Sequence, residues 1–150
     1  MIKGRNRHSC GFLRQNDRNY VVVVGGNHEH EPGQFAIENS VECLDVTEGI
    51  PKDPTEQPSW TPCPPIPKPL KEAFMLTYDK TGSVILIGGT TLTNESEPET
   101  SKDIYELSEI DGNWNFRGKL KDDRCLFLAL LLPDDNKVPC DNFEANHLEL

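Results

Sequence analysis

The chain lacks any apolar run long enough to cross a membrane. Only 35% of its 150 residues are hydrophobic and 7% are aromatic, and the longest apolar stretch is Cys125–Leu132. A membrane-spanning helix needs about 18 such residues. The N-terminal stretch MIKGRNRHSCGF also contains no apolar segment of signal-peptide length. These absences predict a protein that does not associate with membranes and is cytoplasmic, with secretion as the alternative.

Basic residues are scarce. The sequence has 15 Lys and Arg against 25 Asp and Glu, which gives a formal net charge of −10. Binding to nucleic acid depends on Lys and Arg that neutralise phosphates, so we expect no nucleic-acid partner. The acidic excess favours a basic protein partner, or it is a solvated surface that aids solubility.

Motifs for metals and phosphates are missing as well. No CxxC pair occurs among the cysteines, which argues against a zinc site. We interpret the cysteines as reduced thiols of an intracellular protein. No GxxxxGK[ST] or GxGxxG motif is present, and we predict no cofactor. The five cysteines are Cys10, Cys43, Cys63, Cys125 and Cys140.

No stretch shows the 3.6-residue periodicity of a helix. The 12 prolines and 11 glycines instead favour turns and short strands. Two apolar runs end in a Gly-Gly pair: Tyr20–Gly26 (YVVVVGG) and Ser83–Gly89 (SVILIGG), which are 63 residues apart. This spacing indicates an internal repeat with long loops.

The repeat extends beyond the glycines. Six apolar pairs match at the same offset of 63: Phe12 with Met75, Leu13 with Leu76, Val22 with Ile85, Val24 with Ile87, Val41 with Ile104, and Leu44 with Leu107. Trp60 and Trp114 are 54 residues apart, so the loop before the last strand is nine residues longer in the first unit. Loops of different length between matching strands are typical of repeated supersecondary units.

Each unit is therefore predicted to contain four short strands. In the first unit they are His8–Leu13, Tyr20–Val24, Asn39–Val46 and a segment that begins at Trp60; in the second they are Ala73–Tyr78, Ser83–Gly89, Asp103–Leu107 and Trp114–Leu120. Asn27–Glu38 and Thr90–Lys102 are expected to be polar loops. Cys125–Leu132 resembles the first strand of a third unit, without its Gly-Gly pair.

The order apolar run, Gly-Gly, polar loop, strand, turn and Trp resembles the Kelch repeat. It occurs as VVVVGG…SVECLDV…Trp60 and as VILIGG…DIYELSE…Trp114, with Leu44 and Leu107 where Kelch repeats usually have Tyr. The resemblance implies an all-β fold of four-stranded antiparallel blades in a β-propeller. It places one blade at about residues 7–65, a second at about 70–120, and the first strand of a further blade at about 125–133, followed by a polar tail over 134–150.

Two blades cannot close a propeller ring, because propellers have 4–8 blades. Unprotected flanks would expose apolar faces. We expect either that the sequence is a fragment of a longer propeller or that it self-associates or assembles with other chains.

Alternating strands place the loops after the second and fourth strands on one rim. Those loops are Asn27–Glu38, Thr90–Lys102, Ile66–Glu72 and Lys121–Arg124. The resemblance implies that this rim binds a partner protein, as in a scaffold or adaptor. The acidic rim would favour a basic partner, or its charge is only solvated. The candidate partner-binding residues are His28, Glu29, His30, Glu31, Glu95, Glu97, Glu99 and Arg124.

Other assignments compete with binding at these positions. His28 and His30 could ligate a metal, but no third ligand is fixed by spacing, and a polar loop is the simpler interpretation. Arg7 and Arg124 could contact a carboxylate or be solvated. We interpret a further set as structural: Gly25, Gly26, Gly88, Gly89, Trp60 and Trp114.

Some Kelch-like propellers carry copper sites that oxidise sugars, which gives an enzymatic alternative. That chemistry requires Cys, Tyr and His to converge on one metal. The three tyrosines, Tyr20, Tyr78 and Tyr105, lie within or at the ends of predicted strands. The sequence therefore favours a binding module that is not an enzyme.

Overall fold

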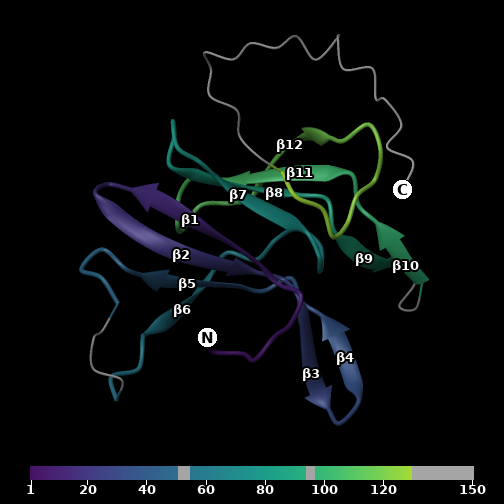
Figure 1. Ribbon diagram of the computed structural model, residues 1–150, viewed down its shortest axis with the longest axis horizontal. Coiled ribbons are helices and arrows are strands. Elements are labelled where there is room, and N and C mark those ends of the chain that lie inside the picture. The colour runs from purple at the N-terminus through teal and green to yellow at the C-terminus, as the bar shows by residue number, and fades with distance from the viewer. Residues whose placement is uncertain (51–54, 94–96, 130–150) are drawn as a thin grey trace.

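The computed structural model describes residues 1–50, 55–93 and 97–129. These residues form β-strands and connections with no helix (Figure 1), and hence no helix that could cross a membrane. They build two four-stranded antiparallel sheets and two separate two-stranded hairpins. The expectation of an all-β chain with antiparallel four-stranded sheets is confirmed.

The two sheets have the same topology. The first has the order β1 (Ser9–Gln15), β2 (Arg18–Val24), β5 (Val41–Asp45) and β6 (Trp60–Cys63). The second has the order β7 (Phe74–Tyr78), β8 (Ser83–Ile87), β11 (Asp103–Leu107) and β12 (Asn115–Lys119). Pro62 lies in β6, where an edge strand tolerates a residue that cannot donate to a sheet.

The two expected polar loops are hairpins, so that prediction was wrong. β3 (Asn27–Glu31) pairs with β4 (Gln34–Ile37), and β9 (Thr90–Thr93) pairs with β10 (Glu97–Thr100). The first hairpin turns at the Pro-Gly signal, where Gly33 has φ 79°. Its strands are polar because both faces are largely exposed, and so they lack the apolar alternation by which strands are recognised.

The repeat offset of 63 holds in the second and third strands, since Val24 pairs with Val41 and Ile87 with Ile104. In the first strand it is 65, because Leu13 lies opposite Tyr20 and Tyr78 lies opposite Ser83. The first hairpin of unit one is two residues longer. The pairing of Phe12 with Met75 and of Leu13 with Leu76 was therefore wrong. A shift of two residues leaves side chains on the same face, so the apolar pattern could not reveal it.

The core lies between one face of the first sheet and one face of the second. A Cβ added to Gly11 would meet Sδ of Met75 at 2.6 Å, so the two sheets approach closely there. Trp114 is buried and its indole Nε1 donates to the carbonyl of Pro64 at 3.1 Å. The fully buried apolar side chains include Leu13, Val22, Val24, Val41, Val84, Leu86 and Leu107.

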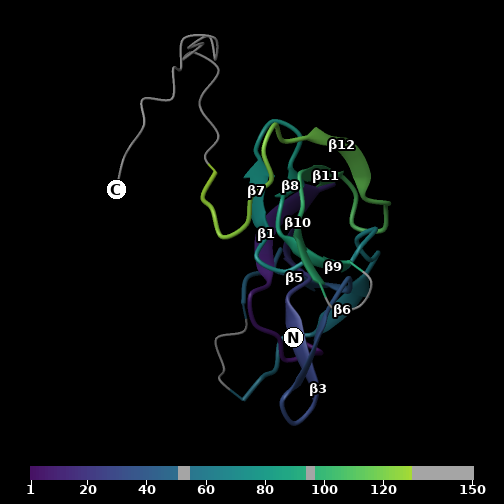
Figure 2. The ribbon, with the colours of Figure 1, turned by 90° about the vertical axis from the view of Figure 1, so that its right-hand side faces the viewer.

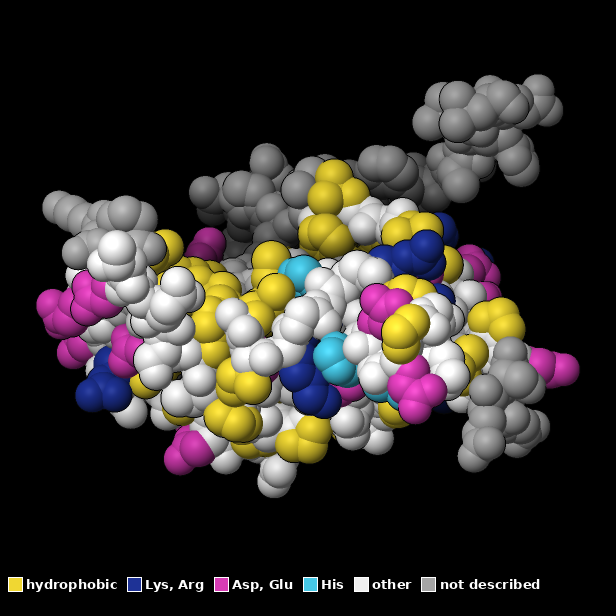
Figure 3. All heavy atoms as spheres, turned by 90° about the horizontal axis from the view of Figure 1, so that it is seen from below, with side chains coloured by type: hydrophobic (Ala, Val, Ile, Leu, Met, Phe, Trp, Pro, Cys, Tyr) yellow, Lys and Arg dark blue, Asp and Glu magenta, His cyan; other side chains and the backbone are white. Residues whose placement is uncertain are grey.

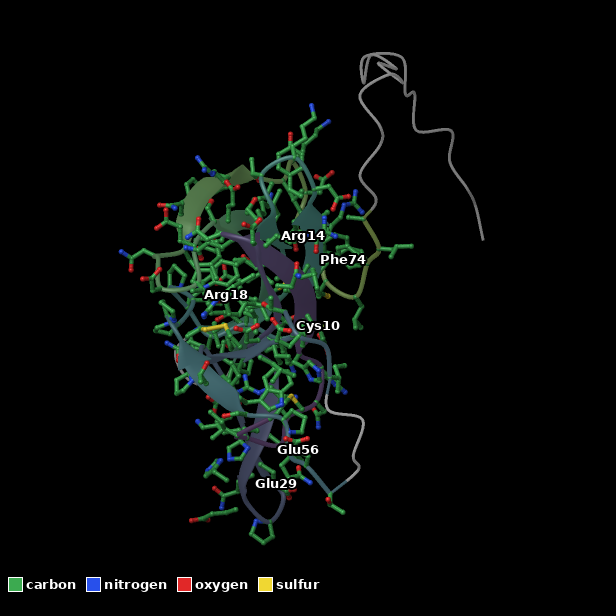
Figure 4. The ribbon with its side chains drawn as sticks, turned by 90° about the vertical axis from the view of Figure 1, so that its left-hand side faces the viewer. Cys10, Arg14, Arg18, Glu29, Glu56 and Phe74 are labelled. Atoms are coloured by element: carbon green, nitrogen blue, oxygen red, sulfur yellow. A yellow bond between two sulfur atoms is a disulfide. The ribbon has the colours of Figure 1, made fainter. Side chains whose placement is uncertain are left out.

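Cys43 and Cys63 form a disulfide between β5 and β6, with their Cα atoms 6.0 Å apart (Figure 4). The expectation of reduced thiols was therefore wrong for this pair. Cross-strand proximity brought them together, which wide spacing in the sequence does not show. Cys10 and Cys125 are free thiols, and Cys140 lies outside the described residues. Because disulfides persist in oxidising compartments, the cysteines no longer support the cytoplasmic expectation.

The segment after the second sheet repeats the backbone contacts that precede it. The amide of Gly26 donates to the carbonyl of Leu70, and that of Gly89 donates to Arg124, both at 2.8 Å. Leu126 N–H donates to Glu72 O at 3.1 Å. Residues 125–129 nevertheless contain no strand, so the expected first strand of a third unit is wrong there. Its remainder and the polar tail lie outside the described residues.

Candidate functional site

The Gly-Gly pairs shape one end of both sheets. Gly25 and Gly88 have φ of 62° and 63°, and Gly26 and Gly89 have 91° and 98°. Side-chain-bearing residues rarely adopt such angles. A Cβ on Gly25 would also lie 2.1 Å from the carbonyl oxygen of Leu70. Each pair therefore turns the chain out of its sheet and lets the next connection pass directly against the backbone.

Both hairpins leave the sheets at this end, and they lie together in the right-hand view (Figure 2). The connection over residues 66–72 runs between them. Lys71 and Thr90 exchange two backbone hydrogen bonds of 2.9 and 2.7 Å, and Leu70 N–H donates to Glu38 O at 3.2 Å. Lys102 Nζ donates to the carbonyl of Lys121 at 3.1 Å. The structure thus brings together the four segments expected on one rim.

The turns at the opposite end form a separate surface. The β1–β2 turn lies beside the β7–β8 turn, where Arg14 N–H donates to Gly82 O at 2.7 Å. Ile110 N–H, in the β11–β12 connection, donates to the side chain of Gln15 at 2.8 Å. Arg14 and Glu29 mark these two distant regions in Figure 4. The turns therefore form an end of the molecule that is separate from the hairpins.

An apolar groove lies between the two hairpins. It has a volume of about 380 Å³ and is lined by Phe35, Ala36, Ile37, Pro69, Thr91 and Leu92. Phe35 is 53% exposed and Leu92 is 40% exposed. Viewed from below, hydrophobic side chains are exposed between acidic ones and histidines (Figure 3). Sequence reasoning missed this groove because it treated both segments as polar loops; the alternation of Phe35 and Ile37 was the available signal.

The acidic residues of the first hairpin have internal partners. Glu29 accepts a hydrogen bond from Gly33 N–H at 2.7 Å, and Glu31 accepts one from Gln34 Nε2 at 2.9 Å. Nδ1 of His28 lies 2.8 Å from the carbonyl oxygen of Gly4. These contacts stabilise the hairpin and its junction with the N-terminal segment. His30 is exposed.

The second hairpin presents acids of its own. Glu97 and Glu99 lie on β10 and are exposed, whereas Glu95 is outside the described residues. Arg124 is also exposed. Its backbone carbonyl accepts a hydrogen bond from Gly89 N–H, and this contact holds its segment at the rim. Arg7 does contact a carboxylate, but it is that of Glu72 in the same chain, at 2.5 Å.

His28 and His30 lie on strand β3 and not in a loop, with a bulge between Glu29 and Glu31. The two histidines are therefore two residues apart on one strand. In the part of the chain that the structure describes, no group of three or more His, Cys, Asp and Glu side chains could hold a metal ion.

Two ion pairs, one buried and one partly exposed, hold segments outside the strands to the sheets. Arg5 binds Glu42 of β5, and Arg5 Nη1 also donates to Gly25 O at 2.9 Å. Burial acts to raise the pKa of Glu42, but hydrogen bonds from the amides of Ile2 and Lys3 and the charge of Arg5 outweigh it and lower the pKa. The N-terminal segment is therefore tied to the Gly-Gly turn.

In the second sheet, Lys68 Nζ lies 2.7 Å from Oδ2 of Asp103. Partial burial acts to raise the pKa of Asp103, but the hydrogen bond and charge of Lys68 lower it overall. Burial, together with the Asp103 carboxylate, raises the pKa of Tyr105 to about 12. Lys68 thus fixes the connection that lies between the hairpins.

No family model matches the chain, and no curated protein matches it. A solved structure described as that of YjhT is similar, with a TM-score of 0.56 and 18% sequence identity. The similarity covers 83% of this chain and 35% of YjhT, so the chain spans about a third of that protein's length. At this identity the likeness concerns the fold alone.

Proposed function

We propose that this chain is part of a Kelch-type β-propeller that binds a partner protein through the rim formed by its two hairpins. It acts as a scaffold or adaptor and catalyses no reaction. The partner segment it takes is extended and basic, with apolar side chains.

The internal repeat supports the propeller assignment. Two sheets of identical topology pack face to face, with their first strands β1 and β7 in contact. Each is followed by a connection that crosses its Gly-Gly turn with matching hydrogen bonds. Propellers are built from such repeated four-stranded sheets.

The groove between the hairpins is the observation on which the binding function rests. Exposed Phe35 and Leu92 line it, and large apolar side chains gathered at one exposed site are typical of interaction surfaces. Glu97 and Glu99 stand on the neighbouring strand. Carboxylates around an apolar centre select basic partners and accelerate their association.

An array of immobilised peptides that combine Lys or Arg with Leu or Pro tests this function. The chain should retain such peptides, and the substitutions Phe35→Ala and Leu92→Ala should each weaken retention by about tenfold or more. Glu97→Gln with Glu99→Gln should reduce the dependence of binding on salt. Asp79→Asn, which removes an exposed acid at the opposite end, should change neither the retention of the peptides nor its dependence on salt.

The absence of any retained basic peptide would overturn the proposal. Equal retention by the groove variants and the Asp79→Asn control would do so too, because binding would then not involve the groove.

A further inference from the structure

The second sheet exposes an apolar face on the side away from the core. Cross-strand pairing places Phe74 beside Ile87 and Ile104, and Leu76 beside Ile85. All five side chains are only partly buried. Phe127 covers one corner, with its ring centroid 5.8 Å from that of Phe74. The remainder is a row of partly exposed apolar side chains beside Glu106, which lies opposite Ile85 and binds Arg117; we call this surface the trailing face.

The repeat shows what kind of surface fits the trailing face. Its members Ile85, Ile87 and Ile104 correspond at offset 63 to Val22, Val24 and Val41 of the first sheet. Those three valines are at most 2% exposed, because they lie in the core against the second sheet. The trailing face is thus the counterpart of a surface that a neighbouring sheet covers within this chain.

The first sheet has the complementary outer surface, which we call the leading face. Phe12 pairs with Val21, Val21 with Leu44, and Leu44 with Trp60, so these four side chains share it. Phe12, Val21 and Trp60 are partly exposed.

The counterparts of the leading face lie inside the core. Val21 and Leu44 correspond at offset 63 to Val84 and Leu107, which are both fully buried. Trp60 corresponds to Trp114, which is inserted between the sheets and donates a hydrogen bond to the carbonyl of Pro64. The leading face is therefore the counterpart of the surface that the second sheet presents to the first.

We propose that the trailing face of one molecule packs against the leading face of a second molecule of this chain. The contact reuses the sheet-on-sheet packing already present between the two units, with Trp60 inserted as Trp114 is. The Arg5–Glu42 pair and the N-terminal segment form the polar edge of the leading face and leave Phe12, Val21 and Trp60 accessible.

Because two different faces meet, the association is head-to-tail, and it gives rings where the rotation closes and open chains where it does not. The two faces lie on the flanks of the sheets, away from the groove between the hairpins. The proposal is therefore independent of partner binding at the rim.

Sedimentation equilibrium of the full chain from micromolar to millimolar concentration tests the association. The wild-type chain should form dimers and larger species. Ile85→Asp on the trailing face and Val21→Asp on the leading face should each raise the dissociation constant by about tenfold or more. Ile50→Asp, at an exposed apolar residue in a loop of the first unit, is the matched control and should associate as the wild type does.

Mixing distinguishes head-to-tail contact from any symmetric one. The Ile85→Asp chain keeps an intact leading face and the Val21→Asp chain an intact trailing face, so an equimolar mixture should form heterodimers that stop at two molecules. In the Trp114→Phe variant, fluorescence from Trp60 should shift to the blue as concentration rises. A wild-type chain that remains monomeric throughout, or a mixture with no heterodimer from two variants whose circular dichroism matches the wild type, would overturn the proposal.

Discussion

Gly25 and Gly33 adopt similar backbone angles in different surroundings. Their φ values are 62° and 79°, but an added Cβ would lie 2.1 Å from Leu70 O at Gly25 and would meet nothing within 4 Å at Gly33. Gly33→Ala should therefore lose about 1–2 kcal/mol of stability, the cost of the left-handed conformation alone. Gly25→Ala must in addition displace the connection through Leu70.

Thermal unfolding of the two variants measures the difference. Gly25→Ala should lower the melting temperature clearly more than Gly33→Ala. Equal melting temperatures would show that the connection does not pass against the Gly-Gly turn as described.

Glu42 makes stability depend on pH in a defined direction. Its pKa is lowered in the folded state from the ordinary value of 4.5, so the unfolded chain binds the proton first as the pH falls. The stabilisation is complete at neutral pH and is lost as the pH falls through 4.5 towards the lower folded pKa. Glu42→Gln should cost about 3 kcal/mol near neutral pH, the scale for breaking a buried pair.

The difference in melting temperature between the wild type and Glu42→Gln, measured against pH, tests this. It should be large at neutral pH and should shrink in acid, whereas the exposed control Glu48→Gln should differ little from the wild type at any pH. A difference that grows as the pH falls would contradict the ion pair with Arg5.

The disulfide joins two neighbouring strands, one of which is the edge strand β6. Cys43 is buried, and the bond closes a segment with a sequence separation of 20 residues. A disulfide that closes a loop of about this length stabilises the folded state by about 3 kcal/mol, because it restricts the conformations of the unfolded chain. Cys63→Ala should therefore lower the melting temperature under oxidising conditions. Reductant should lower the melting temperature of the wild type to the same value.

Cys10→Ser provides the control, since Cys10 is an exposed free thiol. It should melt as the wild type does, with and without reductant. If reductant leaves the wild-type melting temperature unchanged, the bond contributes nothing to stability.

Strands buried on at least one face could be predicted from the sequence, because β-branched runs such as Tyr20–Val24 and Ser83–Ile87 carry their own signal. The hairpins β3–β4 and β9–β10 could not, because β3, β4 and β10 are largely exposed and polar, and the buried residues of β9, Thr90 and Thr91, are polar too. The groove could not be predicted for the same reason, because its apolar side chains come from these two hairpins and one connection. The disulfide was missed because it depends on strand pairing and not on spacing along the chain.

At the scale of the whole molecule, the rim and the two outer faces all depend on how the sheets pack. If the first sheet covers the second as described, the hairpins share one end and each sheet keeps one outer face. The two sheets approach closely at Gly11, which lies against Met75 and Val84. Between the sheets, Trp114 reaches the carbonyl of Pro64.

A nuclear Overhauser spectrum of the full chain tests this packing most directly. Cross-peaks should join the Hα protons of Gly11 to the Met75 methyl group, and the indole N–H proton of Trp114 to the segment around Pro64. If cross-peaks between paired strands such as β2 and β5 are present while these inter-sheet cross-peaks are absent, the two sheets form but do not pack as described. That result would contradict the account.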